Sequence, residues 1–114
     1  MTEKKSFVLY FDMYPNIYDL PADQRGELLS AIFEYAEAEA AAEFDPEDDG
    51  QCNKEWVLSK HREMDSGTRM AFSFIAETIH RDTAKWWTKH ERYQKAALER
   101  IRKAQEEYEK LPPI

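Results

Sequence analysis

The chain has 114 residues, with 23 Asp and Glu against 16 Lys and Arg, and its formal net charge is −7 at pH 7. This length fits one domain, and six Tyr, three Trp and four Met supply apolar area for a small core. No apolar stretch approaches the roughly 18 to 20 residues that cross a bilayer. No P-loop, GxGxxG, GxSxG or HExxH pattern is present. We therefore expect a cytoplasmic, non-enzymatic binding protein with no membrane partner.

The first half of the chain predicts two helices. Residues 6–11 form an apolar run, which is either a buried strand or an extended segment packed on helices. Pro21 at the first helical position and Asp23 in the first turn predict a helix to about residue 43, and Gly26 within it suggests close approach by a neighbouring element. After the acidic loop of residues 45–53, Asn53 is predicted to cap a shorter helix that ends before Gly67.

The second half predicts one long helix. From Thr68 to Leu111 there is no Gly or Pro, and apolar or semi-apolar residues recur about every 3.5 positions, as in a coiled-coil seam. Such a helix either bends near residues 80–85 or projects and packs on another copy or a partner. Its expected core residues are Phe72, Phe74, Ile75 and Ile79. The fold class is therefore mainly α, a single helical domain over residues 1–114.

Three blocks of sequence carry a resemblance. They are KSFVLY at residues 5–10, LxxDQxGxLLxAIFxY at residues 20–35, and MAFSFI at residues 70–75 followed by RDxxKW at residues 81–86. In this order they resemble a family of small phage and prophage proteins of unknown function, over about residues 5–87. The resemblance implies a mobile-element origin, a bacterial host cell and a mostly helical domain. It supplies no catalytic residues, and residues 88–111 form a helical extension where family members carry a basic, Gly-rich tail.

The acidic charge is concentrated in one segment. Residues 1–55 contain 14 acids and 4 bases, and between Gly26 and Asn53 there are nine acids and no base. One interpretation is a solvated helix face followed by an acidic loop. The other is a negative surface that mimics nucleic acid and binds a basic protein groove. The candidate contact residues are Glu34, Glu37, Glu39, Glu43, Asp45, Glu47, Asp48 and Asp49.

Together with the implied mobile-element origin, this surface suggests an inhibitor of host nucleic-acid machinery. A CRISPR nuclease is the most concrete partner, because such enzymes hold nucleic acid in positively charged channels. Trp87 is a further candidate contact, since adjacent tryptophans point about 100° apart on a helix and the seam can bury Trp86 alone. Burial of both tryptophans is the competing interpretation.

An alternative function is a phage replication or packaging accessory factor that binds DNA or a replisome protein. It would use the bases of the long helix, with Trp86, Trp87 and Tyr93 available to stack on nucleobases. Acids interleave with these bases, which favours an ordinary solvated face. A third possibility is a homodimer through the seam of residues 86–111. The bases are Arg69, Arg81, Lys85, Lys89, Arg92, Lys95, Arg100, Arg102 and Lys103.

We expect no cofactor, with a structural metal ion as the lesser alternative. Glu77 and His80 form a Glu-x-x-His pair on one helical face, a spacing used in bundle metal sites. Such a site needs further ligands, and the spacings of the other candidates specify nothing. His61 fits a packed or hydrogen-bonded core histidine better. The remaining candidates are Cys52, Asp82 and His90.

Overall fold

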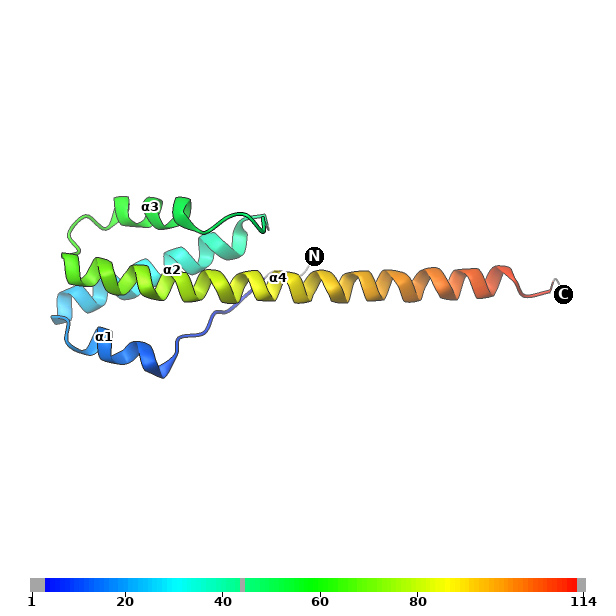
Figure 1. Cartoon of the computed structure of the whole chain (residues 1–114), viewed down its shortest axis with the longest axis horizontal. Helices are drawn as coiled ribbons and strands as arrows, with labels where there is room; N and C mark the ends of the chain where they lie inside the picture. Colours follow the sequence, from blue (N-terminus) through cyan, green and yellow to red (C-terminus); the bar gives the residue numbers. More distant parts are fainter. Residues whose placement is uncertain (1–3, 44, 113–114) are drawn as a thin grey trace. The chain divides into compact units, whose positions relative to one another are not determined.

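The computed structural model describes residues 4–43 and 45–112, and within these ranges the fold is mainly α, as predicted. A short 3₁₀ turn, η1 (Phe11–Met13), leads into α1 (Tyr14–Tyr18), and α2 (Ala22–Ala41), α3 (Gln51–Lys60) and α4 (Ser66–Glu109) follow (Figure 1). The chain divides after Ala84 into two parts, and each part is described by itself.

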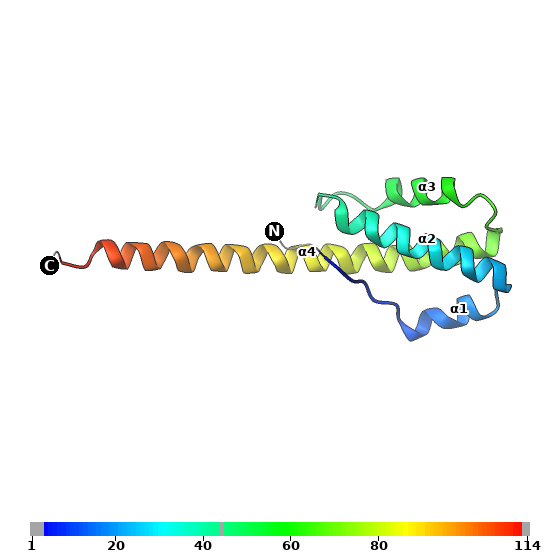
Figure 2. The same cartoon turned by 180° about the vertical axis from the view of Figure 1, so that it is seen from behind.

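The core of the first part lies between α2, α3 and the first turns of α4. In both views α2 runs along the N-terminal turns of α4, with α1 and α3 to its two sides (Figures 1 and 2). Tyr35 and Phe72 meet edge to face in this core, with ring centroids 5.8 Å apart. Each large apolar side chain buried here contributes about 1.5–3 kcal/mol to folding. The buried apolar residues are Met13, Leu28, Ala31, Ile32, Tyr35, Ala36, Val57, Met64, Ala71, Phe72, Ile75, Ala76 and Ile79.

The start of α4 is fixed by a side-chain cap. The Asp65 carboxylate accepts hydrogen bonds from the backbone N–H and from the hydroxyl of Thr68, both at 2.8 Å. The backbone N–H is the larger cause of the lowered pKa of Asp65. Because a capping carboxylate satisfies N–H groups that the first turn leaves unpaired, the helix begins at Ser66.

The predicted limits of the shorter helix are wrong. α3 begins at Gln51 rather than after Asn53, because Gly50 adopts a positive φ of 78° and turns the chain there. The helix ends at Lys60, and the chain leaves helical geometry at His61 before α4 starts. Gly67 therefore lies inside α4 and does not mark the end of α3.

Two packing expectations also need correction. An added Cβ on Gly26 would meet no atom within 4 Å, so no neighbouring element approaches there. Phe74 is 53% exposed, whereas Phe72, Ile75 and Ile79 are buried as predicted. The cause is helical geometry, since two positions rotate a side chain about 200° around the axis and turn Phe74 away from the core.

The apolar run at residues 6–11 forms no strand. Phe7 packs edge to face on Phe33, with centroids 5.0 Å apart, while Val8 and Leu9 are exposed. Phe11 begins η1 and is 98% exposed. This segment is therefore extended and rests on α2 through one aromatic side chain.

The second part of the chain, from Lys85 onward, is formed by the rest of α4. The helix is continuous through residues 80–85, where a bend was one of the two predicted options. Every residue from Glu91 to Pro112 is exposed. Among the described residues, no helix combines the length and the apolar character needed to cross a membrane.

Candidate functional site: an acidic segment held by histidines

The candidate site is the stretch of residues 34–49, called here the acidic segment. It consists of the C-terminal half of α2 and the loop that leads to α3. The structure separates the eight predicted acidic residues into two groups. Glu34 and Glu39 are engaged inside the first part of the chain, and Asp48 is half-buried. The exposed members are Glu37, Glu43, Asp45, Glu47 and Asp49.

Glu39 is an interior residue. Its side chain is 5% exposed, and its carboxylate accepts a hydrogen bond from the Tyr35 hydroxyl and lies 3.0 Å from Nδ1 of His80. Burial raises the pKa of Tyr35, and the hydrogen bond to Glu39 raises it further, so the phenol stays protonated as a donor. Glu39 is therefore not part of the exposed surface for which it was a candidate.

Glu34 is held by a second histidine. His61 lies between two carboxylates of α2, with Nδ1 2.7 Å from Oε2 of Glu27 and Nε2 against Oε2 of Glu34. Burial lowers the pKa of His61, but the hydrogen bonds to Glu27 and Glu34 outweigh it and the net shift is upward. The pKa of Glu34 is lowered, chiefly by its hydrogen bond to His61. This cluster joins the end of α3 to α2.

The loop part of the acidic segment is ordered by its own aspartates. The carboxylates of Asp45, Asp48 and Asp49 each accept a hydrogen bond at 3.0 Å from the backbone N–H two residues further on. These are Asx turns, which replace the hydrogen bonds of regular structure. Nε2 of His80 also donates to the Asp48 carbonyl, at 2.7 Å, and so attaches the loop to α4.

Gly50 closes this arrangement. A Cβ at this position would lie 2.3 Å from the Tyr35 hydroxyl, 2.6 Å from Oε1 of Glu39 and 2.9 Å from Nδ1 of His80. The positive φ of Gly50 disfavours a larger residue independently. The backbone of the loop therefore rests directly on the polar cluster of Tyr35, Glu39 and His80.

The residues considered as metal ligands have other partners. Glu77 pairs with Lys54 at 3.7 Å, His80 bonds Glu39 and Asp48, and Asp82 accepts a hydrogen bond from Tyr10 at 2.5 Å. Cys52 is exposed, and His90 stacks on Trp86. Across residues 4–43 and 45–112, no three His, Cys, Asp or Glu side chains are grouped so that they could hold a metal ion.

Trp87 is half-buried and belongs to an aromatic group at the start of the second part. Its ring meets Trp86 edge to face, with centroids 4.9 Å apart. Trp86 in turn stacks on His90 at 5.0 Å with nearly parallel planes. Trp87 is therefore an edge of an aromatic cluster on α4 rather than an isolated exposed ring.

The anchoring residues were missed in the sequence. Tyr35 and Glu39 lie four positions apart, a spacing that brings side chains together on a helix. Gly50 is the one glycine of the acidic loop. Both were available signals. No local pattern could identify His80 as their partner, because it lies 41 residues from Glu39 in the chain.

The comparisons with known proteins give one match. No curated protein and no solved structure shows a significant similarity to the chain. A family model described as a family of unknown function (DUF6291) matches residues 6–104. This range covers the acidic segment and continues along α4 beyond Trp87. The chain therefore belongs to the DUF6291 family of proteins, whose function is unknown.

Proposed function

We propose that the chain is a non-enzymatic binding protein, encoded by a phage or other mobile element, that blocks a basic nucleic-acid-binding surface of a host protein. A CRISPR nuclease is the most concrete target. The observation that carries this proposal is the group of five exposed carboxylates within residues 37–49, a stretch that contains no Lys or Arg. A concentrated negative surface steers and binds a basic groove.

The anchoring of the loop supports this function. Asx turns and the bond from His80 to the Asp48 carbonyl hold the backbone of the acidic segment before any partner binds. A surface that is already ordered loses less conformational entropy on association. The exposed carboxylates would therefore meet a rigid partner groove at fixed positions, as phosphates of a nucleic acid do.

The buried polar cluster supports binding rather than catalysis. Tyr35, Glu39 and His80 contain the residue types of acid–base chemistry. Their polar atoms are directed at one another and at the Asp48 carbonyl, and Gly50 covers them. Within the described residues no buried side-chain nitrogen or oxygen lacks a hydrogen-bond partner. The cluster serves the fold of the acidic segment.

The test is inhibition of target cleavage by purified RNA-guided nucleases. The segment variant is E37K/E43K/E47K, whose three side chains are exposed and make no recorded hydrogen bond or ion pair. The matched control is E63K/E91K/E109K, which makes the same change of net charge outside the segment. Circular dichroism verifies that both variants keep the helical content of the parent chain.

We expect the parent chain and the control variant to inhibit cleavage, and the segment variant to require at least about tenfold more protein for the same inhibition. Equal loss in the two variants would assign the effect to net charge and contradict the surface. An unaffected nuclease at saturating protein would contradict the choice of target.

A specific observation also favours the alternative function, a replication or packaging accessory factor. Beyond Ala84 the chain carries eight Lys and Arg against five Glu, the reverse of the balance before that residue. Salt-dependent binding of DNA by the full chain, unchanged in E37K/E43K/E47K, would favour this function.

A further inference from the structure

The charges of the second part of α4 are sorted around the helix. At about 100° per residue, six cations fall on one side within a flank about 80° wide. Glu107 is the one acid among them. We call this set the cationic flank, and it consists of Lys85, Lys89, Arg92, Arg100, Lys103 and Lys110.

The cationic flank is not neutralised within the chain. The ion pairs recorded for this stretch join Arg102 to Glu99 and to Glu106, all on the opposite side of the helix. No ion pair is recorded between any member of the flank and a described carboxylate. Its positive charge is therefore available to a partner.

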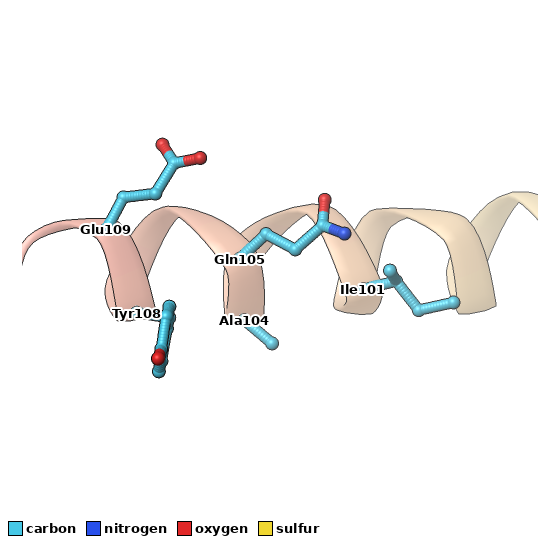
Figure 3. Close-up of a pocket in the computed structure, with 5 residues that line it drawn as sticks. All are labelled: Ile101, Ala104, Gln105, Tyr108 and Glu109. Carbon is cyan, nitrogen blue, oxygen red and sulfur yellow. The ribbon is translucent and has the colours of Figure 1, made fainter.

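An apolar stripe runs directly beside the cationic flank. Its aromatic members Tyr93 and Tyr108 are 64% and 77% exposed. Figure 3 shows Ala104 and Tyr108 projecting from one side of α4, with Gln105 and Glu109 along the other edge of a shallow hollow that Ile101 also lines. The helix thus presents cations and accessible aromatic faces in two adjacent rows.

We propose that the cationic flank and the aromatic residues beside it form a binding site for single-stranded nucleic acid. Proteins that bind single strands without sequence preference combine a positive track for the phosphates with aromatic side chains on which the bases stack. The two rows on α4 supply these two elements along one continuous helix. This site is distinct from the acidic segment and does not rest on the function proposed for it.

The arrangement fits a single strand better than a duplex. A helix in the major groove has a phosphate backbone on each side of it. Here the cations occupy one side, while Glu91 and Glu109 lie beyond the other edge of the stripe and would face the second backbone. One row of cations suits one row of phosphates.

Charge also disfavours a second copy of the chain as the occupant of this face. Two antiparallel α4 helices packed through the stripe would bring the cationic flanks together. In a parallel pair Lys89 and Lys103 would face Gln94 and Tyr108, which carry no negative charge. A polyanion satisfies all six cations, whereas another copy satisfies none.

The test measures binding of the full chain to a labelled oligothymidylate of about 20 nucleotides by fluorescence anisotropy. The flank variant is R100Q/K103Q, and the matched control is K95Q/R102Q on the opposite side of the helix. Both variants replace one Arg and one Lys. We expect binding at about 50 mM salt that weakens steeply toward about 200 mM, since each neutralised phosphate adds about −0.7 to the logarithmic slope for single strands.

We expect R100Q/K103Q to weaken binding about tenfold and to make the salt slope shallower, with the control close to the parent chain. Y93A/Y108A should weaken binding about fivefold or more without changing the slope, because stacking is not ionic. Equal losses in the flank and control variants would overturn the site, as would absence of binding at low salt. Equal or tighter binding to duplex DNA or to anionic phosphatidylglycerol vesicles would also overturn it.

Sedimentation of the free chain checks the other occupant of this face. A monomer at the concentrations of the binding assay is expected. A stable dimer that dissociates in Y93A/Y108A would show that the stripe is covered by a second copy, and would overturn the proposal.

Discussion

His80 of α4 lies between the Glu39 carboxylate, 3.0 Å from Nδ1, and the backbone carbonyl of Asp48, 2.7 Å from Nε2. Glu39 belongs to α2 and Asp48 to the loop before α3, so one imidazole ring connects three segments of the chain. Both ring nitrogens are occupied. The exposed carboxylates of the acidic segment therefore owe their positions to a residue outside it.

Replacement of His80 tests this connection. We expect H80A to lower the free energy of unfolding by about 1–3 kcal/mol, because it leaves buried Glu39 without one partner and frees the loop. Chemical denaturation measures the loss, and hydrogen exchange should become faster at Gly50 and Gln51. H90A is the histidine control, since His90 makes its recorded contacts only within the second part. A smaller loss in H80A than in H90A would contradict the role of His80.

Gly50 and Gly26 should respond oppositely to the same substitution. G50A meets a positive φ and atoms nearer than 3.0 Å, so a loss of at least about 1–2 kcal/mol is expected. G26A lies in an exposed turn of α2 with open space around the new methyl group. It should gain about 0.5–1 kcal/mol. Thermal melts of the two variants check the prediction, and a neutral or stabilising G50A would contradict the described packing of the loop.

The His61 cluster predicts a dependence of stability on pH. The pKa of His61 is raised above its ordinary value of 6.5, so its contribution is complete below pH 6.5 and is lost as pH rises through the folded-state pKa. The pKa of Glu34 is lowered from 4.5, so its contribution is present above pH 4.5 and is lost as pH falls through its folded-state pKa. The ion pair therefore stabilises the chain most between these values.

Urea unfolding across pH 4 to pH 9 measures this profile. H61Q should remove the decline that begins above pH 6.5, and E34Q should weaken it, because each variant removes one partner of the pair. Parent and H61Q curves that run parallel above pH 6.5 would exclude His61 as the group responsible.

The long helix illustrates what a local pattern can predict. The absence of Gly and Pro from Thr68 to Leu111 correctly indicated α4, and the periodic apolar positions correctly placed Phe72, Ile75 and Ile79 in the core. The same periodicity continues through Tyr93 and Tyr108, which are exposed. A repeat in the sequence identifies a face of a helix, but not whether a partner covers it.

The limits of α3 show where local signals compete. Asn53 is a good capping residue, yet Gly50 turns the chain three positions earlier and the helix starts there. The Asp65 cap begins α4 and separates it from α3. Both signals are present in the sequence, and packing of the loop on Tyr35 decided between them.

The sequence by itself determined the helical class, the approximate limits of α2 and α4, and the concentration of acids between Gly26 and Asn53. These follow from local spacing, capping and composition, which act over a few residues. Only the tertiary structure decided which carboxylates are exposed. Glu37 and Glu39 are two positions apart, but about 200° of helical rotation sends one to solvent and the other to His80. That partner lies on another helix, so no pattern within the acidic segment distinguishes the two.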